Sequence, residues 1–323
     1  MSFTSEVKEE LSSQISNAQH CRIAEIAAII SMCGNIIISV NDRYLIKVYT
    51  ENISVARKFA ELIRKTFKIN ADISIRHSAY SKKARTYTII VRRHEDSIKI
   101  LQATKLMDHE GNIEEDMSIT DNIVTMKNCC KRAFIRGAFL STGSIMDPNK
   151  SYHFEIVCNC EEKAEQLVKM LQIFDIESKI VARKGYFVVY IKEGESIVDV
   201  LNVMEAHVSL MNFENVRILK DMSNYYNRQV NCETANIKKT VTTACRQIDA
   251  IHYIEDTVGI DYLPESLQEI AKVRVEYPDT PLKDLGGLLE NPIGKSGVNH
   301  RLRKICEIAE DLKERNKEDS HDN

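Results

Sequence analysis

Ala133-Phe-Ile-Arg-Gly-Ala-Phe-Leu-Ser-Thr-Gly-Ser-Ile145 is the stretch that decides the predicted fold. Ala133, Gly137 and Ser141 recur at every fourth position, so a helix here carries a narrow stripe of small residues along one face. Such a stripe allows a second helix to approach closely. Gly143 follows, and glycine suits a left-handed C-terminal cap, so we expect the helix to end there.

A second helix of the same design is predicted 109 positions earlier, in Ala24-Glu-Ile-Ala-Ala-Ile-Ile-Ser-Met-Cys-Gly-Asn-Ile36. The stripe is less clean, because Met32 stands where the later stretch has Ser141. Such a repeat implies two similar halves joined across paired helices. The alternative is two unrelated amphipathic helices that both end in glycine. The matched positions are Ala24 with Ala133, Ile26 with Ile135, Ala28 with Gly137, Ile30 with Phe139, Gly34 with Gly143 and Ile36 with Ile145.

The flanking segments repeat as well, which predicts an α+β fold with two halves of the order αββαββα. In the first half we expect a helix capped by Thr4 or Ser5 and running through Val7, Leu11 and Ile15. Strands are predicted at 36–40, 44–50, 71–76 and 86–92, and helices at 53–67 and 96–106. The second half has predicted strands at 152–157, 179–183 and 186–191 and helices at 162–174 and 196–204, with one strand of its leading pair not evident.

This order resembles the LAGLIDADG homing-endonuclease fold over about the first 210 residues. The resemblance implies that two motif helices form the interface between the halves, and that the sheets form a saddle over the DNA major groove. In nucleases of that family the eighth motif position is an acid that binds the catalytic cation. Here the motifs run from Ile26 to Gly34 and from Ile135 to Gly143, so the eighth positions are Cys33 and Thr142.

A thiol and a hydroxyl are poor ligands for Mg²⁺, which needs carboxylate oxygens. Asp147 lies just beyond the second motif, but its counterpart in the first half is Ile38. We therefore expect the scaffold without cleavage, with no catalytic residue, cofactor or metal. An active endonuclease is the alternative.

Residues 41–105 contain 15 Lys and Arg against 6 Asp and Glu. On a saddle-shaped sheet these charges would follow DNA phosphates. Alternatively, they protect a solvated edge hairpin from aggregation. The acidic segment 108–121 would repel DNA, so we expect it to face away. The basic residues of the second predicted strand pair are Arg76, Lys82, Lys83, Arg85, Arg92 and Arg93.

From about residue 212 the periodicity becomes helical, with helices predicted at 213–226 and 231–254. Asn227-Arg-Gln-Val-Asn-Cys-Glu-Thr-Ala-Asn236 between them is polar and reads as a linker, or Thr234 caps the helix that follows. A helix opens after Pro264, a short helix is predicted at 282–289, and a longer one at 296–315. A short helix, a tight turn and a longer helix predict a helix-turn-helix.

The first turns of that last helix are basic, and acids return only from Glu307. A recognition helix presents this end to base edges, whereas the helix dipole alone would favour acids here. Asn299 and Arg303 could pair with adenine and guanine, and Lys295, Arg301 and Lys304 with phosphates. The alternative is a basic helix that docks a protein. The predicted DNA-binding residues are Lys295, Ser296, Gly297, Asn299, His300, Arg301, Arg303 and Lys304.

The linker quoted above and Lys295-Ser-Gly-Val-Asn-His-Arg-Leu-Arg-Lys304, together with the degenerate repeat, closely resemble the WhiA family of sporulation regulators over nearly the whole chain. The resemblance implies a helix-turn-helix similar to region 4 of sigma factors. It also implies binding to promoter DNA and a link to sporulation, cell division and chromosome segregation in Gram-positive bacteria. Gly294 departs from the serine expected there, which would weaken a cap or a phosphate contact.

Composition adds limits to this hypothesis. No apolar run reaches the roughly 18 residues of a membrane span, and no signal peptide is evident at the N-terminus. The nine cysteines then suggest free thiols in a reducing cytosol. Cys129-Cys130 and Cys158-Asn-Cys160 could indicate a metal, but no second pair lies at zinc-finger spacing. The net charge of −3 argues neither for nor against nucleic acid.

We therefore expect a cytoplasmic, nucleoid-associated protein that binds double-stranded DNA and no small-molecule substrate or membrane. Another transcription factor or RNA polymerase is the candidate protein partner, and the N-terminal domain could be a protein-interaction platform instead of a second DNA-binding surface. The expected boundaries are 1–211 for the bipartite domain, with halves of about 1–122 and 123–211, then 212–246 for a helical linker, 247–315 for the helix-turn-helix domain and 316–323 for a polar tail.

Overall fold

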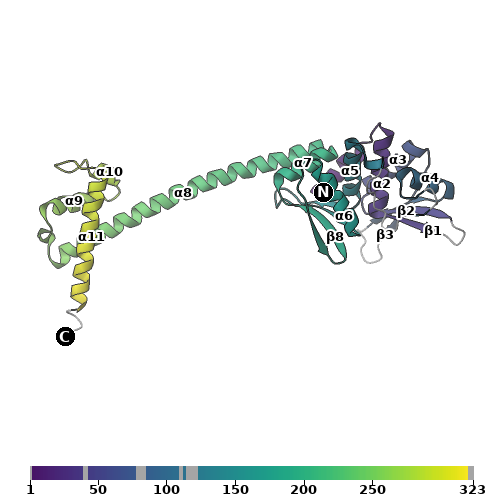
Figure 1. Cartoon of the computed structure of the whole chain (residues 1–323). Helices are drawn as coiled ribbons and strands as arrows, with labels where there is room; N and C mark the ends of the chain where they lie inside the picture. Colours follow the sequence, from purple (N-terminus) through teal and green to yellow (C-terminus); the bar gives the residue numbers. More distant parts are fainter. Residues whose placement is uncertain (1, 39–42, 78–84, 109–111, 114–122, 319–323) are drawn as a thin grey trace. The chain divides into compact units, whose positions relative to one another are not determined.

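The computed structural model describes residues 2–38, 43–77, 85–108, 112–113 and 123–318. The chain forms two compact units, Met1–Lys220 and Asp221–Asn323. Each has its own hydrophobic core, and each is described here by itself (Figure 1). Among the described residues, no helix is both long and apolar enough to cross a membrane.

The first unit repeats one order of helices and strands, as the sequence predicts. Its first half consists of α1 (Phe3–Ser13), α2 (Gln19–Cys33), β1 (Gly34–Ile38), β2 (Tyr44–Thr50), α3 (Ile53–Phe67), β3 (Asp72–His77), β4 (Arg85–Val91) and α4 (His94–Thr104). Its second half consists of a 3-10 turn (Ile123–Thr125), α5 (Asn128–Thr142), β5 (Gly143–Ile145), β6 (Phe154–Cys158), α6 (Glu161–Gln172), β7 (Lys179–Arg183), β8 (Tyr186–Ile191) and α7 (Gly194–Met204).

Each half forms a four-stranded antiparallel sheet, in the order β1-β2-β4-β3 and β5-β6-β8-β7. Side chains alternate between the two faces of a strand, so one face of each sheet packs on the helices and the other is open. In the first sheet Ile46, Val48 and Ile89 lie on the helix side and are buried. In the second sheet Phe154 and Ile156 do the same.

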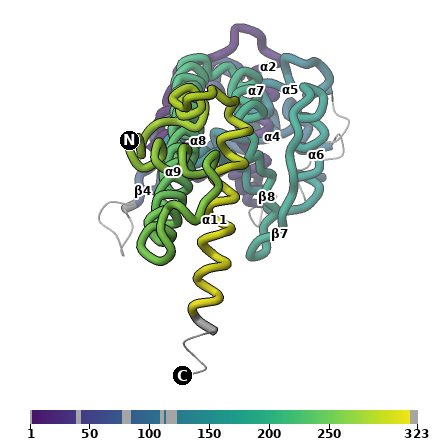
Figure 2. Tube along the Cα trace, turned by 90° about the vertical axis from the view of Figure 1, so that its left-hand side faces the viewer, coloured from purple at the N-terminus to yellow at the C-terminus, as the bar shows by residue number. Residues whose placement is uncertain are grey.

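The motif helices α2 and α5 pack side by side, as Figures 1 and 2 show, and Gly137 of the stripe of small residues lies at their contact. Gly137 is the point of closest approach, because a Cβ atom there would lie 2.7 Å from the carbonyl oxygen of Glu25 and 2.8 Å from the Cβ of Ala28. Van der Waals contact between carbons needs about 3.5–4.0 Å. Only glycine therefore permits this helix spacing.

Both motif helices end at their glycines, but the predicted left-handed cap is wrong. Gly34 has φ −83° and Gly143 has φ −80°, so each begins an extended strand. Glycine is needed for space instead. A Cβ atom on Gly34 would lie 2.3 Å from the carbonyl oxygen of Ile30, and one on Gly143 would lie 2.6 Å from that of Phe139.

A buried network of charges ties these helices to their neighbours. Glu25 of α2 is fully buried and accepts from Lys58 Nζ of α3 at 2.5 Å and from Arg136 Nε of α5 at 3.2 Å. Arg136 Nη1 also pairs with Glu205 Oε2, just after α7, at 2.7 Å. Buried charges are tolerated only when they are paired and hydrogen-bonded, so this network fixes α2, α3, α5 and α7 in one arrangement.

Two further local predictions differ from the structure. Ser2, rather than Thr4 or Ser5, caps α1, because its hydroxyl accepts from the backbone N–H of Ser5. Thr4 instead exchanges hydrogen bonds with the backbone of Ile145 in β5. That strand is the missing member of the second leading pair, and it has only three residues.

The second unit is helical. It consists of the C-terminal part of α8 (His207–Thr257), a 3-10 turn (Ile260–Tyr262), α9 (Glu265–Glu276), α10 (Leu282–Leu285) and α11 (Lys295–Glu318). The linker expected at 227–236 is not a break, because α8 is one continuous helix of 51 residues. Its N-terminal part contributes Phe213 to the first core, and its C-terminal part contributes Ile251 and Ile254 to the second.

Candidate nucleic-acid interface

Helix α11 has one buried face and one exposed face. Val298, Leu302, Ile305 and Ala309 are buried against α8, α9 and α10. Figures 1 and 2 show α11 beside α9. The opposite face of the first three turns is exposed, and it carries Lys295, Ser296, Asn299, His300, Arg303 and Lys304.

The turn before α11 is tight, because Gly286 and Ile293 lie in contact. Ile293 N donates to the carbonyl oxygen of Gly286 at 3.1 Å, and a Cβ atom on Gly286 would lie 2.1 Å from the carbonyl oxygen of Ile293. The helix then begins at Gly294, whose carbonyl oxygen accepts from Gly297 N and Val298 N. Gly294 has no side chain to bond the N–H groups of Lys295 and Ser296, which leaves them available to an anion.

Two of the predicted recognition residues have partners inside the domain. Arg301 is half-buried, and its Nη1 donates to the carbonyl oxygen of Ser266, in the first turn of α9, at 3.2 Å. Gly297 packs near Ile293, where a Cβ atom would lie 3.3 Å from Cδ1 of that side chain. Arg303 is exposed and pairs with Glu307 at 2.9 Å, a surface pair that opens at little cost.

The predicted basic surface of the first half is divided in the structure. Arg76 pairs across the strands with Thr86, and Arg85 with His77, so Arg76 and Arg85 project from opposite faces of the sheet. Arg76 lies on the open face. Arg85 has the same parity as the buried Tyr87 and Ile89, so it projects from the helix side at the end of β4.

Arg92 and Arg93, from the same predicted group, do not form a continuous basic surface with Arg76, because both are paired with acids. Arg92 pairs with Asp72 at 2.6 Å, and Arg93 lies 3.7 Å from Glu95 and 3.8 Å from Asp96. All three pairs lie at the C-terminal end of β4, whereas Arg85 is at its N-terminal end. Lys82, Lys83 and most of the acidic segment 108–121 lie outside the described residues.

The open faces of the two sheets carry three cations that sequence reasoning did not single out. Lys47 pairs across the strands with Ile90 and so has the same orientation as Arg76. Lys179 and Arg183 lie on the open face of the second sheet, opposite Tyr190 and Tyr186. The alternation of side chains along a strand would have predicted these three residues from the sequence, because each of them alternates with residues that face the helices.

The nuclease-type centre would lie where α2 and α5 end, and its two ligand positions do not fit a hard cation. Burial raises the pKa of the Cys33 thiol to about 11, against the effects of a hydrogen bond from Ser141 and the charge of Lys8. Thr142 Oγ1 is buried without a hydrogen-bond partner among the described residues. The nearby positive charge is the ammonium of Lys8, whose pKa burial lowers to about 8.

Asp147 does not replace the missing carboxylates. Its Oδ1 accepts from both the backbone N–H and the side-chain amide of Asn149, at 2.9 and 3.0 Å, and so closes the turn after β5. These hydrogen bonds hold the pKa of Asp147 below its usual value. Its first-half counterpart, Ile38, is an exposed apolar side chain.

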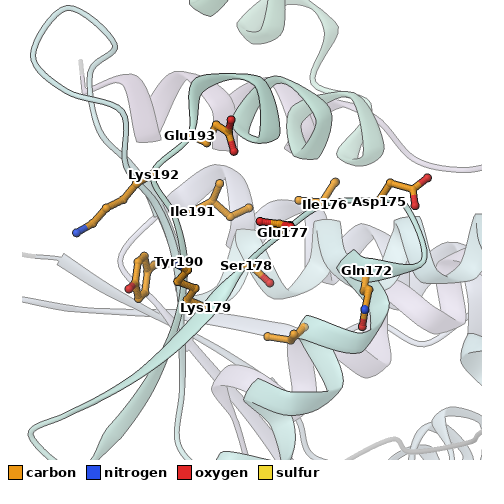
Figure 3. Close-up of a pocket in the computed structure, with 11 residues that line it drawn as sticks. Gln172, Asp175, Ile176, Glu177, Ser178, Lys179, Tyr190, Ile191, Lys192 and Glu193 are labelled. Atoms are coloured by element: carbon orange, nitrogen blue, oxygen red, sulfur yellow. The ribbon is translucent and has the colours of Figure 1, made fainter.

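A separate pocket in the second half contains none of the motif-end residues. Figure 3 shows Gln172, the last residue of α6, and Asp175, just after that helix, on one side, and Tyr190 of β8 and Lys192, just after that strand, on the other. Its lining mixes acids with bases, and Lys192 Nζ lies 5.3 Å from the ring centre of Tyr190. Such mixed charge does not favour a polyanion such as DNA.

Comparison with known families accounts for both units. Residues 19–107 match the WhiA N-terminal LAGLIDADG-like domain, residues 131–223 match the WhiA LAGLIDADG-like domain, and residues 226–309 match the WhiA C-terminal HTH domain. The chain belongs to the WhiA family.

Relatives of known sequence and structure cover almost the whole chain. A protein of Lachnoclostridium phytofermentans named probable cell division protein WhiA is 53% identical over 97% of this chain and 100% of its own length. A protein of the same name from Thermoanaerobacter pseudethanolicus is 47% identical over 98% of this chain and 99% of its own length. The crystal structure of full-length WhiA from Thermotoga maritima aligns with a TM-score of 0.58 at 26% identity, covering 96% of this chain and 98% of that one.

Membership of the WhiA family confirms the α+β repeat and the C-terminal helix-turn-helix that the sequence predicts. Because a helix-turn-helix is a DNA-binding motif, the family assignment supports DNA binding by this chain. The LAGLIDADG-like domains of this WhiA family member lack carboxylates at both eighth motif positions. Its scaffold is therefore nuclease-like while its motif ends are not.

The structure also brings together four side chains that the sequence did not connect. His20, Cys21, Cys129 and Cys130 place their ligand atoms within 4.8 Å of one another at the start of α2 and α5. The sequence shows Cys129 and Cys130 only as an adjacent pair, and from it we expect no metal; the structure adds His20 and Cys21 to that pair. The repeat offset of 109, applied to cysteine, would have joined Cys21 to Cys130.

Proposed function

We propose that this protein is a non-enzymatic, sequence-specific transcription regulator that reads promoter DNA with helix α11. By its relatives' name it acts in cell division, and by the resemblance of its motifs it is also linked to sporulation and chromosome segregation. Its place is the cytoplasm, at the nucleoid. Another transcription factor or RNA polymerase is the protein partner that such a role would require.

The observation that carries this proposal is the division of α11 into a buried apolar face and an exposed face whose N-terminal end, from Lys295 to Lys304, carries basic residues and no acid, whereas acids and bases alternate from Glu307 onward. The major groove is about 12 Å wide and admits one helix. Asn299 and Arg303 lie one turn apart, at a spacing that suits adjacent adenine and guanine edges. Lys295 and Lys304 flank them and would hold phosphates, as would the free N–H groups at the start of the helix.

The first unit has two candidate roles. Lys47, Arg76, Lys179 and Arg183 on the open sheet faces support a second DNA contact, in which case the two modules together bind more tightly than either alone. The exposed apolar side chain of Val181 on the same face supports a protein-interaction platform instead. Arg76 is the residue that distinguishes the two roles.

The test is a salt series of DNA-binding measurements with single alanine variants. Arg303→Ala should cost about 1–3 kcal/mol at the preferred site and relax specificity, because a bidentate base contact is lost. Lys304→Ala should weaken binding to all DNA sequences equally, and should reduce the magnitude of the slope of log K against log salt by about 1. Arg76→Ala should lower the slope in the same way only if the first unit contacts DNA.

Arg315→Ala is the matched control, since Arg315 is exposed on the same helix but lies beyond its basic end. It removes one positive charge without touching the proposed interface, and should leave both the site preference and the salt slope unchanged. If Arg303→Ala and Lys304→Ala behave like Arg315→Ala, α11 does not lie in the groove.

A further inference from the structure

Four potential metal ligands converge where the motif helices begin, at the opposite end from Cys33 and Thr142. His20 and Cys21 lie in the first turn of α2, and Cys129 and Cys130 in the first turn of α5. His20 Nδ1 lies 3.3 Å from the Sγ of Cys21, 3.3 Å from that of Cys130 and 3.9 Å from that of Cys129. All four ligand atoms lie within 4.8 Å of one another.

The internal repeat builds this cluster from both halves. The offset of 109 that relates Ala24 to Ala133 also relates His20 to Cys129 and Cys21 to Cys130. Each half therefore supplies one buried thiol, Cys21 or Cys130, and one exposed ligand, His20 or Cys129. The cluster joins the halves directly at their helical interface.

The donor set is that of a structural zinc site. Zn²⁺ is held by four tetrahedral ligands, commonly cysteine sulfur and histidine nitrogen, and three cysteines with one histidine is an established combination. With Zn–S of about 2.3 Å and Zn–N of about 2.0–2.1 Å, two sulfurs lie about 3.8 Å apart in a tetrahedral site, and a sulfur and a nitrogen about 3.6 Å apart. The distances between ligand atoms in the cluster run from 3.3 Å to at most 4.8 Å. A shift of less than about 1 Å by any side chain would therefore bring the four ligand atoms to tetrahedral spacing.

We propose that His20 Nδ1 and the sulfurs of Cys21, Cys129 and Cys130 bind one Zn²⁺ ion that joins the two halves of the first unit. Binding forms three Zn–S bonds and one Zn–N bond, and releases the three thiol protons to solvent. Neutral His20 contributes the lone pair of Nδ1 and keeps its proton on Nε2. All four positions are filled by protein, so the site is structural and independent of DNA binding.

The first experiment measures zinc in the full-length chain, purified without chelator, without a histidine tag and with a reductant that does not bind metal. Elemental analysis after dialysis should find about one zinc per chain. Replacing zinc with Co²⁺ should give the visible absorption of a tetrahedral site and the near-ultraviolet absorption of thiolate ligation. A chelator should lower the unfolding temperature of the first unit, because the ion binds only the folded form.

The decisive variants are Cys129→Ser and His20→Asn, since both side chains are exposed and their replacement leaves the core intact. Each should lower zinc affinity by more than about 100-fold, because even outer partners of a metal ligand account for about 10–100-fold. Cys245→Ser replaces an exposed cysteine outside the cluster and should keep the full zinc content and cobalt spectrum.

Two results would overturn the proposal. One is a wild-type protein that holds no more zinc than Cys129→Ser after identical purification. The other is a thiol titration of the freshly purified, unfolded chain that finds seven free thiols instead of nine, with Cys21 and Cys130 linked as a disulfide. In that case the cluster would be an oxidisable pair and not a metal site.

Discussion

Lys8 of α1 places an ammonium group beside the Cys33 thiol, at the end of the first motif helix. Burial lowers its pKa to about 8, although the charges of Cys33 and Glu51 act in the opposite direction. The unfolded chain keeps this proton up to about pH 10.4. Between these two values the unfolded state therefore binds more protons than the folded state, and stability rises with pH.

Lys8→Met should abolish that rise. The free energy of unfolding of wild type minus that of the variant should increase from about pH 8 to about pH 10.5, by at most about 1.4 kcal/mol per pH unit, and should be flat below pH 8. The measurement is chemical unfolding across this range. The test uses the pH dependence of this free-energy difference and not its absolute value. The substitution also changes packing, but that contribution does not depend on pH. Parallel curves for the two proteins would show that the ammonium is not desolvated.

Site residues could be predicted from the sequence where all of them lie on one helix, and could not where two helices must pack together to form the site. The exposed basic face of α11 follows from periodicity alone, because Val298, Leu302 and Ile305 mark the buried side. Cys21 and Cys130 illustrate the opposite case. They are far apart in the chain, and only the packing of α2 on α5 brings their sulfurs together.

At the scale of elements, the regular amphipathic segments of the first unit were all predicted, some of them to the residue and the others within about two residues at each end. The bounds of α3, β7 and β8 agree because their apolar spacing is regular and turns flank them. Strand β5 was missed because three residues are too few to show alternation. The separation into two helices at 213–226 and 231–254 was wrong, since a polar composition does not prevent a helix when no proline or glycine interrupts it.

Gly137→Ala tests whether the α2–α5 interface depends on backbone contact. Alanine is the better helix former by about 1 kcal/mol, so propensity alone predicts stabilisation. A methyl group 2.7 Å from the carbonyl oxygen of Glu25 must push the helices apart, however, and overpacking of this kind costs about 1–3 kcal/mol. We therefore expect calorimetry to show a lower unfolding temperature for the first unit.

The control for this variant is Gly194→Ala, at the first residue of α7. The three atoms nearest to a Cβ atom there belong to the side chains of Tyr152 and Arg217, at 3.3–3.4 Å, and none of them is a backbone atom. Its unfolding temperature should stay close to that of wild type. If Gly137→Ala proved as stable as Gly194→Ala, the stripe of small residues would not set the helix spacing.

At the scale of the whole molecule, phosphodiester cleavage would need both halves at once, because each motif helix supplies one ligand position at a shared cation site. Cys33 and Thr142 fill these positions with a thiol and a hydroxyl, and the ammonium of Lys8 adds positive charge that would repel Mg²⁺. We therefore expect supercoiled plasmid to remain intact with Mg²⁺ or Mn²⁺, even at protein concentrations that saturate DNA binding.

A gel assay that compares the wild type with Asp147→Ala decides the matter, because Asp147 is the nearest carboxylate in sequence beyond the second motif. Its oxygen already closes a turn with Asn149, so the substitution should change neither DNA binding nor the intact plasmid. Metal-dependent nicking by the wild type that disappears in Asp147→Ala would show that the protein is an endonuclease after all. Equal nicking by both proteins would show that Asp147 takes no part in the reaction.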